Sequence, residues 1–282
     1  MLTSDWHIHS RNSCDGACMP VADLIAGSAE KGIVAYGLTD HIHTPYNLPD
    51  LYASRAEYLG LAPSPDFHFG VEVSVVSQWE LDEFAGGRQE GCTYGLRSGG
   101  PAGCDLAIGL TAEDIAELQI EYVVGGTHWP MYVEVEREIV IRDYHRQNMF
   151  LATHPLVNIV AHPWWWMGKW QDADGVYRGA PWLDDFGSIP QSMHEEFAAA
   201  AIEHNKVVEM NISAALQNPQ YPEPFHRQYA EYLAWLKQRG VTLSLGSDCH
   251  SPTYDIDLEQ AAARLAEVGI TDADLWRLPP RQ

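Results

Sequence analysis

Two histidines near the start of the sequence have the spacing of a metal-binding pair. His7 and His9 are separated by one residue, so in an extended strand both imidazoles project to the same side. Imidazole nitrogens suit zinc, iron and manganese, and carboxylate oxygens bridge or neutralise such ions. A pair of this kind is a weak signal by itself, because histidines also lie side by side on strand surfaces without any ligand.

Further side chains of the same chemistry follow other apolar segments along the chain. Each lies at or just after the end of a short apolar run that is typical of a buried strand. These residues are His41, Glu72, His128, His162, Asp248 and His250. A glutamate can use its two oxygens to hold two metals about 3.5–4 Å apart, the separation found in two-metal hydrolases. Random placement of 13 histidines would not select strand ends so often, and we therefore predict a multinuclear metal site.

The segments expected to position these residues alternate along the chain between strand-like apolar runs and helix-like patterns. Strands are predicted over residues 33–38, 67–73, 120–124, 156–160, 207–210 and 241–245, with a weaker candidate over 1–8. Helices are predicted between them, over 20–32, 134–153, 190–204, 223–239 and 255–268. Thr111 followed by Asp114 predicts one more helix start. Such alternation indicates a parallel sheet, and the number of units favours a barrel, in which all carboxyl ends of the strands converge on one face.

Two stretches depart from this alternation. Residues 77–108 are rich in glycine, and we interpret them as an insertion that forms a loop or hairpin excursion and could act as a lid. Residues 164–182 are rich in tryptophan and glycine and form the second irregular stretch. The total length fits one domain over residues 1–282.

The composition narrows the class of protein. The chain has 282 residues, 46% of them hydrophobic, and 39 acidic against 17 basic residues give a net charge of −22. Such an acidic surface repels phosphate backbones, which argues against a nucleic-acid scaffold. No apolar run approaches the ~18 residues of a membrane span, and the first residues lack the pattern of a signal peptide. Five cysteines in a chain of this length fit a reducing cytoplasm better than a disulfide framework.

Other reactive residues receive a structural interpretation. Among the remaining histidines, His43 is the one that we expect nearest the site, because it follows His41 by two residues. Cys14 and Cys18 have no matching pair downstream, so a zinc knuckle is not predicted. The tryptophan run at 164–166 follows His162 directly, and one of its indoles could line the pocket.

The sequence resembles the PHP family (polymerase and histidinol phosphatase) from about residue 5 to residue 252. The opening motifs are Asp-Trp-His-Ile-His-Ser at 5–10, Ser-Cys-Asp-Gly at 13–16 and Gly-Leu-Thr-Asp-His at 37–41. The later motifs follow in the family's order: Glu72, His128, Ala-His-Pro at 161–163 and Gly-Ser-Asp-Cys-His at 246–250. The insertion at 77–108 is not part of the resemblance.

The resemblance implies a distorted (β/α)₇ barrel with two or three divalent metals, which would be zinc, iron or manganese. Transferred to this chain, the first metal would be held by His7, His9, Glu72 and Asp248. The second would be held by Glu72, His128 and His162, with Glu72 as the bridge. The third would be held by Asp15, His41 and His250, although other family members use different residues at the position of Asp15.

Stand-alone members of this size are mostly phosphoesterases, including histidinol-phosphate phosphatases. The resemblance therefore implies hydrolysis of a small phosphate monoester to inorganic phosphate, with catalytic roles for Glu72, Asp248 and His128. A metal-bridging hydroxide would attack phosphorus. Planar guanidinium groups suit phosphate oxygens, and the cations expected to clamp them are Arg137, Arg142, Arg146, Arg178 and Lys169.

Two other functions fit the same residues. The metals could instead hydrolyse a carboxylic ester, amide or lactone, as in amidohydrolase-type barrels, and the tryptophan run slightly favours this alternative because an amidase tolerates an apolar pocket. A non-enzymatic metal-binding protein fits less well, because a structural site closes at four ligands and this chain offers nine.

Overall fold

A parallel sheet that curls into a barrel forms the centre of the computed structural model, which describes residues 1–165, 182 and 185–281. Its strands are, in spatial order, β1 (Ser4–Asp5), β2 (Ala35–Leu38), β4 (Phe67–Ser77), β6 (Tyr122–Gly126), β7 (Ile159–Ala161), β8 (Val207–Asn211) and β9 (Thr242–Gly246). The first and last strands meet, because the Trp6 amide donates to the Leu245 carbonyl at 2.9 Å and Ile8 forms a parallel bridge with Cys249. The structure thus confirms the predicted barrel-type α/β fold.

The barrel strands are buried on both faces. Every residue of β4 is buried, and all five residues of β6 and β8 are as well. Strands enclosed by side chains on the inside and helices on the outside need continuous apolar runs rather than alternation, which is why these segments stand out in the sequence. The polar residues appear where each run ends, at the carboxyl-terminal face of the barrel.

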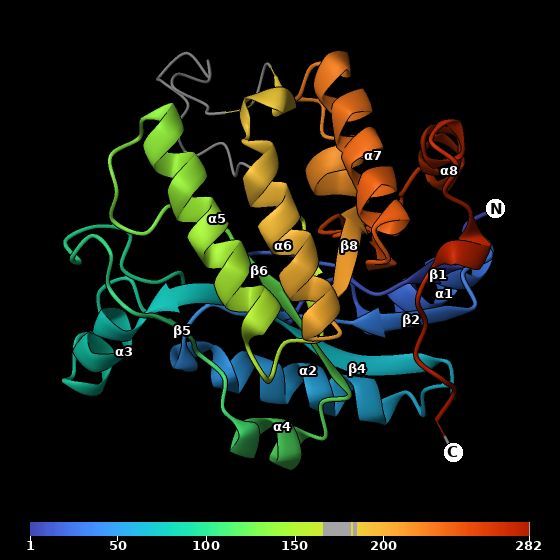
Figure 1. Ribbon diagram of the computed structural model, residues 1–282. Helices are drawn as coiled ribbons and strands as arrows, with labels where there is room; N and C mark the ends of the chain where they lie inside the picture. The colour runs from blue at the N-terminus through green and yellow to red at the C-terminus, as the bar shows by residue number, and fades with distance from the viewer. Residues whose placement is uncertain (166–181, 183–184, 282) are drawn as a thin grey trace.

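Helices cover the outside of the barrel (Figure 1). They are α1 (Val21–Glu30), α2 (Leu48–Gly60), α4 (Ala112–Leu118), α5 (Arg137–Thr153), α6 (Gln191–Glu203), α7 (Glu223–Gln238) and α8 (Leu258–Glu267). Figure 1 shows α5, α6 and α7 standing side by side, with α2 on the other side of the sheet below β4. Thr111 and Asp114 form the expected capping box at the start of α4. The chain also makes short helical turns, η1 (Pro45–Asn47), η2 (Phe186–Ser188), η3 (Ile212–Leu216, a π-helix) and η4 (Asp272–Asp274).

The glycine-rich region 77–108 begins at the end of β4. A capping box between Ser77 and Glu80 starts α3 (Gln78–Ala85), and the chain returns through β5 (Leu106–Ile108), which pairs antiparallel with the end of β4. A further short strand, β3 (His41–Ile42), pairs with β4 at the level of Glu72. The tip of the excursion reaches the site face, where the Tyr94 hydroxyl donates to the Cys14 carbonyl at 3.1 Å.

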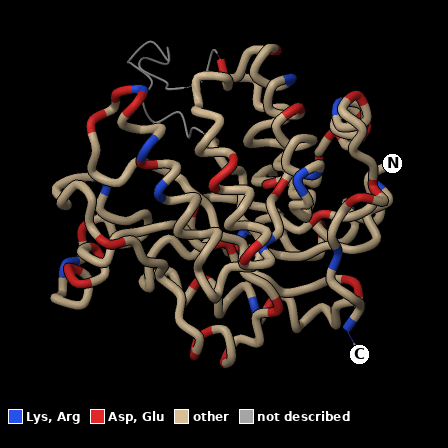
Figure 2. Tube along the Cα trace, viewed as in Figure 1, with Lys and Arg blue, Asp and Glu red and all other residues tan. Residues whose placement is uncertain are grey.

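Acidic positions are distributed over helices and loops along the chain (Figure 2), and the sequence contains 39 acidic against 17 basic residues. Among the residues that the structure describes, no helix is long and apolar enough to cross a membrane.

Candidate functional site

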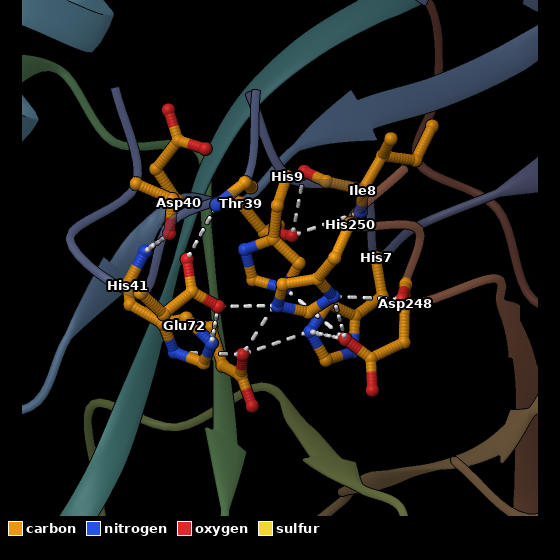
Figure 3. Close-up of polar contacts among 12 residues, drawn as sticks. His7, Ile8, His9, Thr39, Asp40, His41, Glu72, Asp248 and His250 are labelled. Carbon is orange, nitrogen blue, oxygen red and sulfur yellow. Dashed lines mark hydrogen bonds and ion pairs between the residues drawn. The ribbon is translucent and has the colours of Figure 1, made fainter. Parts of the chain in front are cut away.

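Glu72 lies at the centre of the predicted cluster and is completely buried (Figure 3). Its Oε2 is 2.9 Å from His7 Nε2, 3.0 Å from His41 Nδ1 and 3.4 Å from His9 Nε2. Its Oε1 faces a second pair of imidazoles, with 3.1 Å to His128 Nε2 and 3.2 Å to His162 Nε2. The two carboxylate oxygens therefore divide the imidazoles into two groups, which is the arrangement that a bridging glutamate needs.

Two aspartates complete the cluster. Asp248 Oδ1 lies 3.2 Å from His9 Nε2 and 3.4 Å from His250 Nδ1. Asp15 Oδ2 lies 3.3 Å from His41 Nε2 and also contacts His250 Nε2. The structure thus brings all nine predicted metal-ligating residues together, although they are spread over more than 240 positions of the chain. Ligand atoms within 4.8 Å of one another form overlapping groups that include His9-Asp15-His41-His250, His7-His9-Glu72-Asp248 and His41-Glu72-His128.

The donor atoms of this cluster fit divalent metal ions. Imidazole nitrogens and carboxylate oxygens form the whole set, as suits borderline ions such as zinc, iron and manganese. Nδ1 of His9 and Nδ1 of His162 are buried without a hydrogen-bond partner, which is costly unless something else satisfies them. The backbone is also strained at two of the ligands, with positive φ of 56° at Asp248 and 27° at His162. Such conformations persist where the surrounding structure imposes them, and they concentrate at functional sites.

Charge pairing holds the cluster together. Burial by itself would raise the pKa of Glu72, but the neighbouring imidazoles, chiefly His41, His7 and His128, hold it well below its usual range. Burial opposes protonation of His41, yet Glu72 and a second carboxylate raise its pKa to about 10. His128 differs, because burial outweighs the attraction of Glu72 and lowers its pKa to about 4. Metal ligation requires deprotonated imidazoles. A metal cation that binds here would therefore displace the imidazole protons and balance the charge of the carboxylates in their place.

Glu209, which the sequence did not identify as a site residue, forms hydrogen bonds with residues of the cluster. Glu209 Oε1 lies 2.6 Å from His7 Nδ1, and its Oε2 accepts hydrogen bonds from the His162 amide at 2.7 Å and from Asn211 Nδ2 at 3.0 Å. Asn211 Nδ2 also donates to Asp248 Oδ2 at 3.2 Å. Partners of this kind fix the orientation of metal ligands. The available signal was a glutamate inside the apolar strand β8, two residues before Asn211 and therefore on the same face.

The ring of His128 is oriented in a similar way. Ser74 Oγ lies 2.9 Å from His128 Nδ1 and 2.6 Å from His43 Nδ1, so His128 presents Nε2 to Glu72. His43 lies at the edge of the site, as its position in the sequence predicts. Asp40 does not reach the site, because its oxygens accept hydrogen bonds from Ser10 and from another buried serine.

A cavity of about 420 Å³ opens above the cluster. Its wall combines the exposed side of the cluster with aromatic groups and one guanidinium, and its lining residues are Asp15, His41, His43, Tyr94, Arg97, His128, Trp129, Trp165, Asp248 and His250. Trp165 belongs to the run at 164–166, whereas Trp164 is buried in the core. This volume lies in the range of sites for small molecules.

The structure does not bring the predicted arginines of α5 to this cavity. Arg137 is exposed at the start of the helix, and Arg142 lies 4.0 Å from Glu138 on the same surface. Arg146 pairs with Asp143 at 2.9 Å. The other two predicted cations lie outside the described residues, and they are Lys169 and Arg178.

Among the described residues, one lysine or arginine lines the cavity, and it is Arg97. It comes from the excursion at 77–108, for which the sequence predicts a loop or hairpin that could act as a lid but does not indicate which residue would face the cavity. No apolar periodicity links this position to the barrel, so only the folded path of the loop could identify it.

The third group of ligands can be tested separately. Asp15 contacts His41 and His250 but not Glu72, so Asp15→Ala should remove one metal ion and leave the others mostly in place. Elemental analysis of the purified variant measures this as a lower metal-to-protein ratio. If the change empties the whole site, the division into separate centres is wrong.

Known proteins share the family and the fold of this chain. The PHP domain family matches residues 5–245. A histidinol phosphate phosphatase from Lactococcus lactis subsp. lactis, solved with zinc, L-histidinol and phosphate, has a TM-score of 0.59 and 15% identity, over 95% of this chain and 94% of that one. A putative histidinol phosphatase from Listeria monocytogenes has a TM-score of 0.58 and 13% identity, over 92% and 99%. No curated protein sequence matches the chain. The family match spans most of the chain, and the protein therefore belongs to the PHP domain family.

Proposed function

We propose that this protein is a metal-dependent phosphoesterase that hydrolyses small phosphate monoesters and releases inorganic phosphate. The observation that carries the proposal is the position of Glu72, whose two oxygens face separate imidazole groups at the floor of a cavity of about 420 Å³. A cluster of divalent ions at this floor attracts anions despite the net charge of −22, because bound cations dominate the local field. The cavity size favours a small substrate.

The residues present would hold two or three divalent ions in the sets that the family resemblance implies. The first set is His7, His9, Glu72 and Asp248, the second is Glu72, His128 and His162, and the third is Asp15, His41 and His250. When bound, such ions act as Lewis acids and lower the pKa of a coordinated water toward ~7. Zinc is the ion in the related structure from Lactococcus lactis.

The chain's own residues would position the reacting groups. Glu72 fixes the spacing between the two imidazole groups, and Asp248 contacts both the buried His9 and His250, which lines the cavity. Ser74 keeps Nε2 of His128 directed toward the centre. Tyr94, Trp129 and Trp165 add an aromatic wall to the cavity, from which a bound substrate would displace water. Exclusion of water strengthens every electrostatic contact inside the site.

The substrate that we propose is a phosphate ester similar to histidinol phosphate. The related enzyme from Lactococcus lactis was solved with L-histidinol and phosphate, and its fold covers nearly all of this chain. We also propose a cytoplasmic location, because all five cysteines are free in the structure. The acidic surface argues against a nucleic-acid partner.

The aromatic wall favours a second candidate function. Apolar rings suit the uncharged acyl group of an ester, amide or lactone, which an amidohydrolase-type reaction at the same metals would cleave.

A substrate screen tests the choice between the two reactions. We expect turnover of phosphate monoesters, including histidinol phosphate, that depends on added divalent metal and is inhibited by inorganic phosphate. Carboxylic esters, amides and lactones should turn over far more slowly. Turnover of esters or amides without turnover of any phosphate ester would make the amidohydrolase-type reaction the function.

A further inference from the structure

Arg97 has an unusual setting for a surface arginine. Its guanidinium carbon lies 3.5 Å from the ring centroid of Trp129 and 5.8 Å from that of Tyr94. Its Nε donates to the Tyr94 carbonyl at 2.8 Å, while the buried Nη1 has no hydrogen-bond partner. Among the described residues, no carboxylate forms a salt bridge with it. One face and one edge of the guanidinium are thus occupied, and donors remain unused beside the cavity.

The loop that carries Arg97 is built to hold it in this place. The buried carboxylate of Glu80 accepts hydrogen bonds from the amides of Leu96 and Ser77 and from the Ser77 hydroxyl. Gly95 adopts a φ of +85°, and a Cβ at this position would lie 2.6 Å from Glu80 Oε1. The loop also contacts the body of the protein, where the Thr44 hydroxyl donates to the Cys92 carbonyl. Arg97 is therefore preorganised, so little entropy is lost when its donors engage a ligand.

The unused N–H donors of Arg97 suit an oxyanion as ligand. A guanidinium presents paired N–H groups whose geometry matches the oxygens of a phosphoryl group. Burial lowers the pKa of Arg97 to about 10, so the group stays charged at neutral pH while it is partly desolvated. Stacking on an indole stabilises a desolvated cation further.

We propose that Arg97 is the residue that clamps the substrate phosphoryl group against the metal cluster, and that this insertion thereby sets the preference for anionic substrates. This inference rests on the proposed phosphoesterase function. The cluster would bind some phosphoryl oxygens, and Arg97, in the wall of the same cavity, would bind others. A phosphate monoester is an anion before it reacts, whereas an ester or amide is neutral, so the effect of Arg97 on substrate binding separates the two candidate reactions.

The test uses Arg97→Gln and Arg97→Lys in the full-length, metal-loaded protein. Calorimetry with inorganic phosphate measures anion binding directly, and hydrolysis of p-nitrophenyl phosphate measures kcat/KM. We expect Arg97→Gln to weaken phosphate binding at least ~10-fold and to lower kcat/KM ~10²–10³-fold, the range for loss of one preorganised hydrogen-bond donor to a transition state. Arg97→Lys should lose less, because it keeps the charge but not the paired donors. Metal content should not change, since Arg97 contacts none of the nine ligands.

Arg88 supplies a matched control within the same excursion. Its guanidinium also stacks on an indole, with 5.9 Å to the ring of Trp79, but it pairs with Glu83 at 3.3 Å and does not line the cavity. Arg88→Gln should therefore bind and hydrolyse like the wild type.

The outcomes separate the two claims. If the wild type hydrolyses phosphate esters and Arg97→Gln binds phosphate and turns over as well as Arg88→Gln does, the clamp is refuted while the function stands. If the wild type hydrolyses no phosphate ester, the proposed function fails. Added guanidinium ion should restore part of the activity of Arg97→Ala, and a lack of rescue together with lost metal would show that Arg97 has only a structural role.

Discussion

Glu72→Gln is expected to lower the metal content of the protein and to abolish hydrolysis while the barrel stays folded. The amide keeps the shape of the side chain but loses its charge, and its NH₂ group would point a donor at imidazole nitrogens. Only one side-chain oxygen remains, so one of the two imidazole groups loses its carboxylate partner. Loss of a supporting residue around a metal typically costs ~10–100-fold, so loss of the bridge should exceed ~100-fold in activity. Elemental analysis and initial rates measure both effects.

Glu121→Gln is the matched control for this change. Glu121 also faces a histidine, with 2.7 Å from Oε2 to His68 Nδ1, but the pair lies near the other end of the barrel, close to the start of β4. The control should keep its metals and its activity. Circular dichroism should show the same folded spectrum for both variants. A Glu72→Gln protein with the wild-type metal-to-protein ratio would refute the bridging role.

Gly126→Ala is expected to damage the site through a single methyl group. A Cβ on Gly126 would lie 2.7 Å from Glu72 Oε1, 2.7 Å from His128 Cε1 and 2.8 Å from His162 Cε1. These side chains must then move away from the centre, and displacement of a reacting group by ~1 Å can cost ~10²-fold in rate. We expect lower metal content and a comparable loss of kcat/KM, measured by elemental analysis and by initial rates.

Gly60→Ala separates this local effect from the general cost of replacing glycine. Gly60 ends α2 and has open space where its Cβ would lie. Alanine there should leave metal content and activity unchanged and should alter the free energy of unfolding by at most ~1 kcal/mol. Full metal content and activity in Gly126→Ala would show that the ligands do not depend on this close packing.

The sequence alone determined the barrel and predicted the nine residues that the structure brings together in one cluster. Parallel strands buried on both faces must be continuous apolar runs, so segments such as Phe67–Ser77 are recognisable without a structure. Histidines and carboxylates at the ends of such runs cannot be explained by packing, because burial of a charge is costly unless it is paired or ligated. That rule applies to the set as a whole, and the family resemblance then implied the separate roles of residues such as Glu72 and Asp248.

Only the tertiary structure decided which residues surround these ligands. Glu209 supports His7 across the barrel, 202 positions away in sequence, and no local pattern encodes that contact. The arginines of α5 follow His128 closely in sequence, yet that helix directs them to the outer surface or to local partners. Arg97 reaches the cavity because the chain between β4 and β5 folds back over the site, and a loop without periodicity does not reveal where its tip lies. Ligand types are thus a local property of the sequence, whereas the pocket around them depends on the path of loops through space.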